Sequence, residues 1–259
     1  MDIKILVASH KEAEIPRDSM YLPVHVGKAL NPDKEFGYQS DAEGHNISIK
    51  NPYYCELTAI YWAWKNLQVD YVGLAHYRRH FSFKPVHSGG WDSVLTEEQA
   101  EGLCKEYDII LPKRRNLYIE TVYSHYDHTF YGEQFDRARE IISRRCPEYI
   151  EAFDKKMESR SEHLFNMFIM KKAFFDRYCE WMFPILEELE CYYDLKAMDP
   201  FQARLIGRVS ERLLDVWVNK NQLKYKEIGY IYLGKSSIHK KVWGFLMAAI
   251  FHKRYKESF

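Results

Sequence analysis

Three short apolar runs in the first half of the chain, each followed at once by basic residues, constrain its fold most strongly. The runs span residues 3–8, 70–75 and 108–112. Each has the length of a buried strand, and helical patterns at 51–67 and 96–107 lie between them. Strands that alternate with helices are typical of an α/β domain, so we predict a mostly parallel sheet with covering helices.

The basic residues follow the carboxyl ends of these predicted strands. They are His10 and Lys11, residues 76–79, and residues 113–115. Because ligands of such sheets bind outside the carboxyl ends of the strands, the three segments should share one rim. Guanidinium groups bind phosphate oxygens bidentately and stay charged when desolvated. The pattern therefore favours an anionic ligand, with a diphosphate as the candidate, over simple solvated loops.

The second half of the chain is mainly helical. Amphipathic patterns predict helices over 134–145, 149–157, 173–190 and 201–219, and a short apolar strand over 166–170. No internal repeat and no low-complexity linker interrupts the pattern. We therefore predict one domain over residues 1–234, followed by a C-terminal tail over 235–259.

The tail differs from the rest in composition. Six basic residues and one acid surround a ten-residue apolar run at 242–251. Ten residues are too few to span a bilayer, which takes about 20. Flanking lysines and Trp243 fit a basic amphipathic helix in an anionic membrane interface. A helix docked on the protein core is the alternative.

Overall composition excludes several classes of protein. Lys and Arg number 37, as do Asp and Glu, and this balance argues against nucleic acid as a partner. The N-terminus lacks the pattern of a secretory signal. The five cysteines show no CxxC spacing, which indicates reduced thiols in the cytoplasm rather than a disulfide framework or zinc site. Motifs of Rossmann dehydrogenases, P-loop kinases and serine hydrolases are also missing.

A histidine-rich segment suggests a different chemistry. His125, Asp127 and His128, with His163 later in the chain, have side chains that can ligate a divalent metal. They would make the chain a metal-dependent hydrolase. The spacing matches no established metal motif, so a solvated loop is the favoured interpretation.

The last long predicted helix carries two features with ordinary structural explanations. Asp199 followed by Pro200 is typical of a helix N-cap and first turn. Glu211 lies three residues from Arg208, which indicates an ion pair on the helix surface. On spacing alone, neither feature requires a ligand.

Several segments together resemble a bacterial family of glycosyltransferases of capsular and exopolysaccharide biosynthesis, long known only as a domain of unknown function. The matching segments are IKILVASHK, YLPVHVG, DAEGHNIS, KNPYYCELTAIYWAWKN, DYVGLAHYRRHF, NMFIM and FQARLIGRVSERLLDVW. They cover roughly residues 3–217, and the GLxHYRR block is the most specific. The resemblance implies a GT-A-like fold and inverting transfer from a UDP-sugar, with galactofuranose or another hexose as the sugar.

The resemblance also assigns catalytic roles. GT-A enzymes usually hold Mn²⁺ or Mg²⁺ with an Asp-x-Asp motif, but this chain has His76-Tyr77-Arg78 at the corresponding place. We therefore expect Arg78 and Arg79, aided by Lys113, to stabilise the departing UDP in place of a metal. Asp199 resembles the carboxylate from which inverting GT-A enzymes draw their base, and the resemblance makes it the predicted base.

Further side chains are predicted to bind substrate. These are His10, Lys11, Asp41, Asn46, His76, Asn166 and Arg204, with Tyr123 and Tyr126 stacking on acceptor rings. The expected acceptor is a lipid-linked glycan, and the expected location is the cytoplasm, peripheral at the inner face of the cell membrane. The rival interpretation is a non-catalytic carbohydrate- or nucleotide-binding module of a polysaccharide assembly complex. Such a module would keep the basic rim but need no base.

Overall fold

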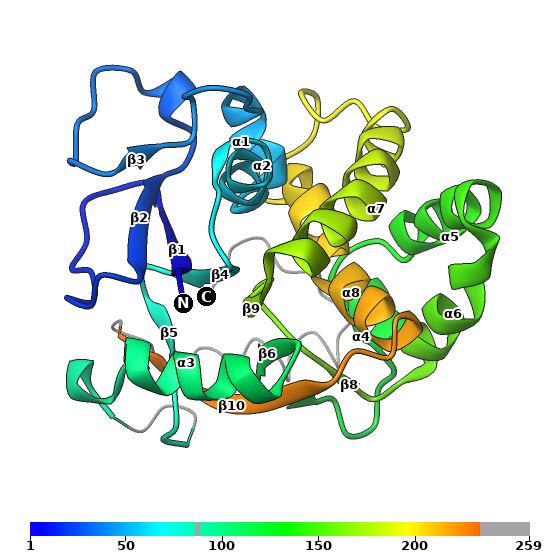
Figure 1. The fold of residues 1–259 in the computed structure, drawn as a ribbon. Coiled ribbons are helices and arrows are strands. Elements are labelled where there is room, and N and C mark those ends of the chain that lie inside the picture. Colours follow the sequence, from blue (N-terminus) through cyan, green and yellow to red (C-terminus); the bar gives the residue numbers. More distant parts are fainter. Residues whose placement is uncertain (86–88, 234–259) are drawn as a thin grey trace.

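The chain is described here by a computed structural model that covers residues 1–85 and 89–233. Eight strands form one sheet, in the order β3-β2-β1-β4-β5-β10-β6-β9, and β9 also pairs with β4 (Figure 1). The strands are β1 (Ile3–Ser9), β2 (Tyr21–His25), β3 (Gln39–Ser40), β4 (Tyr71–His76), β5 (Arg79–Ser82), β6 (Ile109–Pro112), β9 (Phe168–Lys171) and β10 (Tyr225–Tyr232). A separate two-stranded sheet joins β7 (Arg115–Asn116) to β8 (Ser161–Glu162).

Most of the helices follow the predicted pattern, but residues 122–129 form a helix where a solvated loop was favoured. The helices are α1 (Asn51–Tyr54), α2 (Leu57–Asn66), α3 (Glu97–Glu106), α4 (Val122–Thr129), α5 (Glu133–Arg145), α6 (Ile150–Glu158), α7 (Lys172–Glu190) and α8 (Leu205–Lys220). Short 3-10 turns span Lys28–Leu30, Ser48–Lys50, Trp91–Ser93, Pro147–Tyr149 and Gln202–Arg204. The helical second half is thus confirmed, and α4 to α8 gather on one side of the molecule (Figure 1).

The sheet is mixed rather than mostly parallel, which corrects the prediction. β3, β2, β1 and β4 are parallel, and so are β6 and β10. β9 is antiparallel to both β4 and β6, and β5 is antiparallel to β10. For β5 the reason is local: it returns directly after β4 through a two-residue turn, and such a turn can join only antiparallel strands.

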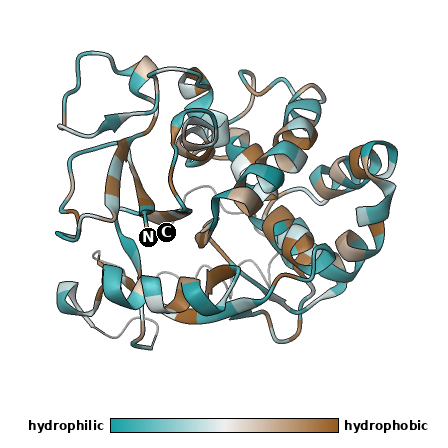
Figure 2. Ribbon diagram, in the orientation of Figure 1, coloured by the Kyte–Doolittle hydropathy of each residue, from teal (hydrophilic) through white to brown (hydrophobic). Residues whose placement is uncertain are grey.

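Apolar residues on both faces of the sheet build the core. In β1, Leu6 and Ala8 pack with α2 and the helical half, whereas Ile5 and Val7 pack toward α3. This alternation explains why β1 is an almost continuous apolar run, because a strand covered on both faces has no solvent-facing positions. Figure 2 shows the same apolar strands between helices whose outer surfaces are polar.

The predicted helix over 51–67 is interrupted. α1 ends at Tyr54, and Cys55 has φ 53° and ψ −129°, a conformation outside the helical region. α8 lies close to this break, since a Cβ added at Gly207 would stand 3.1 Å from Cys55 Sγ. Glu56 follows this break directly, so it does not lie within the continuous helix that was predicted over 51–67.

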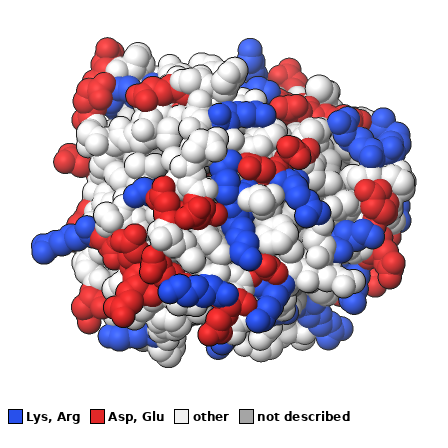
Figure 3. Space-filling view, viewed as in Figure 1, with Lys and Arg blue, Asp and Glu red and all other residues white. Residues whose placement is uncertain are grey.

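The described surface carries both signs of charge. On the face shown in Figure 3, acidic and basic side chains are both present, and acidic ones gather at the lower left. Within residues 1–85 and 89–233, no helix has the length and apolar character needed to cross a membrane. The predicted tail, residues 235–259, lies outside the described residues.

Candidate active site

A pocket of about 620 Å³ opens where β1 and β4 end. Its walls come from the end of β1, the β4–β5 turn, the α1–α2 break, the segment before β9, the start of α8 and the end of β10. Five of the predicted site residues line it: His10, His76, Arg78, Arg79 and Arg204. The rim expected at the carboxyl ends of the strands is therefore present at β1 and β4.

Two arginines in this pocket rest on aromatic rings. The Arg78 guanidinium lies 4.9 Å from the centre of the Tyr77 ring, and that of Arg79 lies 4.2 Å from the Phe165 ring and 5.3 Å from the Tyr232 ring. Within the described residues, neither forms an ion pair with a carboxylate. Aromatic faces hold a cation in place without neutralising its charge. Both positive charges thus remain available to an anionic ligand.

His76 is a neutral hydrogen-bond donor in this wall. Its Nε2 lies 2.7 Å from the carbonyl oxygen of Phe165 and therefore carries the proton. Burial and the nearby charge of Arg79 lower the pKa of His76 to about 4. Because Nε2 is engaged, only Nδ1 remains to accept a hydrogen bond.

Arg204 and Lys11 complete the basic side of the site in different ways. Arg204 lines the pocket, and its Nε donates to Cys55 Sγ at 3.2 Å, across the break between α1 and α2. The Lys11 ammonium lies 5.3 Å from the centre of the Tyr77 ring. Lys11 does not line the pocket. Arg204 is thus tied to the strained segment, and Lys11 stands at the periphery.

Two carboxylates in the pocket were not predicted from the sequence. Glu56 follows the helix break, and Glu211 projects from α8. Burial raises the pKa of both carboxyl groups, and the charge of Glu56 raises that of Glu211 further. Glu211 pairs with Arg212 at 3.0 Å, which corrects the predicted pairing with Arg208. A carboxylate with a raised pKa is suited to accept a proton near neutral pH.

The segment before β9 holds both carboxylates. Asn166 Nδ2 donates to Glu56 Oε1 at 2.7 Å and to Ser210 Oγ at 3.0 Å. The backbone of Phe165 favours the ionised form of Glu211 and so opposes the rise in the pKa of that carboxyl group. Asn166 is buried and does not line the pocket itself, so its predicted contact with substrate stays a prediction.

Asp199 and Lys113 lie outside the residues that line the pocket. Asp199 Oδ1 accepts the backbone N–H groups of Phe201, at 2.9 Å, and Gln202, at 3.3 Å. This is the N-cap geometry that its spacing first indicated. Lys113 is exposed just beyond β6, and its backbone N–H donates to Ile228. Both side chains thus stand outside the pocket lining, and the roles that the resemblance implied for them stay predictions.

Asp41 and Asn46 organise the loop after β2. The carboxylate of Asp41 is fully buried and accepts the N–H groups of Gly27, at 2.8 Å, and Lys28, at 3.1 Å, as well as the Ser48 hydroxyl. Asn46 closes a turn through Ala42 and Gly44 carbonyls. Neither residue lines the pocket.

Asp41→Ala is expected to lower the free energy of unfolding by about 2–4 kcal/mol, because it leaves buried donors without an acceptor. Urea denaturation followed by circular dichroism measures this loss. The exposed Asp33 of the same loop provides the control, since Asp33→Ala should stay within about 0.5 kcal/mol of wild type. Equal stability of the two variants would contradict the structural role.

The residues of the predicted metal site do not meet. His125 and His128 both contact Glu120, at 2.7 and 2.8 Å, whereas His163 contacts Asp215 and Glu227. In the described part of the chain, no three or more His, Cys, Asp or Glu side chains form a group that could hold a metal ion. His163 therefore lies in a different cluster from His125 and His128, which share Glu120.

Comparisons with known proteins agree with this picture. The family model described as a domain of unknown function, DUF4422, matches residues 4–222, and the comparison with curated proteins found no match. Among solved structures, the apo structure of the bifunctional glycosyltransferase WbbM is similar, with 33% sequence identity and a TM-score of 0.83 over 91% of this chain. The match covers 46% of the WbbM chain, so this chain spans about half its length. The pocket thus lies in a domain that belongs to the DUF4422 family.

Proposed function

We propose that this chain is an inverting glycosyltransferase that uses a UDP-sugar. One observation carries the proposal: Arg78 and Arg79 line a pocket without forming an ion pair among the described residues, and two carboxylates line the same pocket. The arginines suit a diphosphate, because guanidinium groups bind phosphate oxygens bidentately. The carboxylates suit sugar hydroxyls, which they can orient and deprotonate. The similarity to a bifunctional glycosyltransferase supports this class of reaction.

The proposed reaction is a single displacement. An acceptor hydroxyl oxygen attacks the anomeric carbon of the donor, the bond from that carbon to the UDP oxygen breaks, and the hydroxyl proton passes to Glu211. Arg78 and Arg79 stabilise the charge that develops on the departing UDP. One displacement inverts the configuration at the anomeric carbon.

Glu211 is preferred as the base over Glu56 for an electrostatic reason. Burial raises the pKa of both, but Asn166, Arg204 and Arg79 all favour the ionised form of Glu56. Burial raises the pKa of Glu211, and the negative charges of Glu56 and Glu162 raise it further. The paired Arg212 lowers this pKa but does not cancel the rise, so the Glu211 carboxylate suits a base. Asp199, whose oxygen caps a helix turn, is not assigned this role.

A divalent metal does not fit the place where GT-A enzymes hold one. Arg78 repels a cation there, and the Nε2 of His76 is already bound to the Phe165 carbonyl. No step of the proposed reaction therefore uses Mn²⁺ or Mg²⁺.

The identity of the substrates and the location rest on the family resemblance. The proposed donor sugar is galactofuranose or another hexose, and the proposed acceptor is a lipid-linked glycan of capsule or exopolysaccharide synthesis. The basic tail would bring the enzyme to the inner face of the cell membrane.

A thermal-shift measurement with millimolar UDP tests the donor site. In EDTA, UDP is expected to raise the melting temperature, because arginines rather than a metal bind the diphosphate. Stabilisation only after addition of Mn²⁺ would mean that the diphosphate site lies elsewhere. If UDP binds, release of UDP from a panel of UDP-sugars separates a transferase from a binding module, which would bind without turnover.

A further inference from the structure

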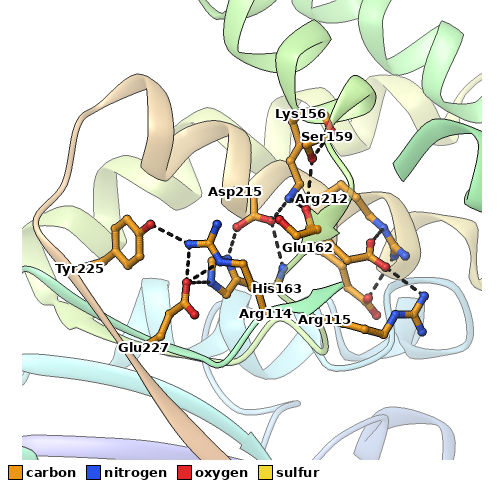
Figure 4. A network of polar contacts seen from close by, with 12 residues as sticks. Arg114, Arg115, Lys156, Ser159, Glu162, His163, Arg212, Asp215, Tyr225 and Glu227 are labelled. Atoms are coloured by element: carbon orange, nitrogen blue, oxygen red, sulfur yellow. Dashed lines mark hydrogen bonds and ion pairs between the residues drawn. The ribbon is translucent and has the colours of Figure 1, made fainter. Parts of the chain in front are cut away.

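His163 is buried in a network of charged side chains beside the proposed active site (Figure 4). Its backbone N–H donates to Asp215 Oδ2 at 3.1 Å, and its Nδ1 contacts the other oxygen of the same carboxylate. Its Nε2 lies 3.2 Å from Glu227 Oε1. Because a carboxylate faces each ring nitrogen, both nitrogens carry protons, and the ring is an imidazolium.

Four other elements surround this imidazolium with charged or titratable groups. These groups are Asp215 on α8, Lys156 on α6, Glu227 and Tyr225 on β10, and Arg114 after β6. Lys156 pairs with Asp215, and Arg114 pairs with Glu227. Glu162, the residue before His163, pairs with Arg212 and Arg115. Burial opposes ionisation of His163, but the two carboxylates outweigh burial and raise its pKa. Hydrogen bonds from His163 in turn overcome burial and hold the pKa of Asp215 at about 2.

Two residues further along, the same segment enters the pocket in an unusual conformation. Phe165 has φ 73° and Asn166 has φ 53°. Left-handed conformations are costly for non-glycine residues, so they persist only where the surroundings fix them. Pairing of β9 with β4 and β6 fixes the segment from Phe168 onward. On the other side, the contacts of His163 with α8 and β10 fix it.

We propose that His163 is a positioning residue: its imidazolium clamps this segment between α8 and β10, so that Phe165 and Asn166 present Glu211 and Glu56 to the pocket. Whether His163 holds this segment does not depend on the activity that is assigned to the protein. The effect of the clamp on turnover rests on the proposed function.

The clamp has a defined dependence on pH. The pKa of His163 is raised in the folded state, so the stabilisation is complete below the unfolded value near 6.5 and is lost as pH rises through the folded value. A neutral imidazole has one N–H and can serve only one of the two carboxylates. The segment should therefore loosen at alkaline pH.

Hydrogen exchange of the Phe165 amide reports on the clamp, because Phe165 lies in the clamped segment, two residues after His163. His163→Gln is expected to lower its protection by at least about tenfold at pH 7, after correction for intrinsic exchange rates. The matched control is His128→Gln, since His128 also contacts a carboxylate but lies on α4. Unchanged protection in a folded His163→Gln variant would overturn the proposal.

A second variant tests the charge, and it also serves if His163→Gln does not fold. Glu227→Gln removes one of the two carboxylates that contact His163, and the contact between His163 and Asp215 remains. Protection of Phe165 should then be lost at a lower pH than in wild type, because Glu227 no longer raises the pKa of His163. Loss at the same pH in both proteins would show that the imidazolium is not what holds the segment.

Activity separates this proposal from the proposed function. If the chain transfers sugar, His163→Gln should lower kcat about tenfold or more and leave KM for the donor nearly unchanged, because the arginines are untouched. An unchanged kcat would refute the catalytic consequence and leave the transferase standing. If wild type neither binds UDP nor releases it from UDP-sugars, the proposed function fails, and hydrogen exchange still decides whether His163 clamps the segment.

Discussion

Replacing Arg79 with alanine is expected to weaken UDP binding by about 10- to 100-fold. Hydrogen bonds to charged groups contribute about 1.5–3 kcal/mol each, and every 1.4 kcal/mol is a factor of ten in affinity. Arg79 is held over the Phe165 and Tyr232 rings, so its guanidinium is already oriented when the ligand arrives. Isothermal titration calorimetry with UDP measures the loss.

Two further variants make the Arg79 result specific. Arg79→Lys should recover only part of the affinity, because an ammonium neither stacks as well on the rings nor binds phosphate bidentately. Arg160→Ala should bind UDP as wild type does, since Arg160 is exposed and contacts the carbonyl of Tyr118 outside the pocket. Equal losses for Arg79→Ala and Arg160→Ala would indicate a general effect of charge and contradict the assigned site.

Glu211→Gln is expected to lower kcat by about 10²- to 10⁴-fold and leave the Kd for UDP close to that of wild type. General bases contribute rate factors of this size, and glutamine keeps the shape of the side chain but accepts no proton. In wild type, kcat should fall as pH drops through the raised pKa of Glu211, because the protonated carboxyl cannot act as base. Rates of UDP release across the pH range measure both effects.

Asp199→Asn distinguishes the two proposed positions of the base. Asparagine is also a good N-cap, so the helix turn should persist and kcat should remain within about twofold of wild type. Loss of turnover in Asp199→Asn with normal turnover in Glu211→Gln would return the base to Asp199. Glu56→Gln is expected to raise KM for the donor more than it lowers kcat, because Glu56 orients hydroxyls in this scheme.

The sequence predicts those parts of the fold that depend on local patterns. The runs at 3–8 and 108–112 appear as Ile3–Ser9 and Ile109–Pro112, since a strand buried on both faces is apolar throughout. The antiparallel insertion of β9 and the central position of β10 were not predicted, because strand partners are set by contacts between distant segments. The interruption at Cys55 was missed for the same reason: its conformation depends on the close approach of α8.

The sequence predicts only part of the candidate site, because local patterns locate its arginines and histidine but not its two carboxylates. His76, Arg78 and Arg79 follow a predicted strand, and the rule for carboxyl ends of strands locates them. Glu56 was hidden within a predicted continuous helix, and Glu211 had an arginine at helical spacing that explained it. The available signal for Glu56 was its position, directly after Cys55 and before an otherwise apolar helical stretch. A carboxylate buried at such a position requires a specific partner.

The central position of β10 also affects the order in which the chain can fold. β10 pairs with both β5 and β6, yet it is the last strand in the described sequence. Chains are synthesised from the N-terminus, so β5 and β6 present open edges until residues 225–232 exist, and open edges pair readily with other chains. A nascent or prematurely terminated chain should therefore aggregate rather than form a smaller stable unit, and refolding should be slow because its completing step joins distant segments.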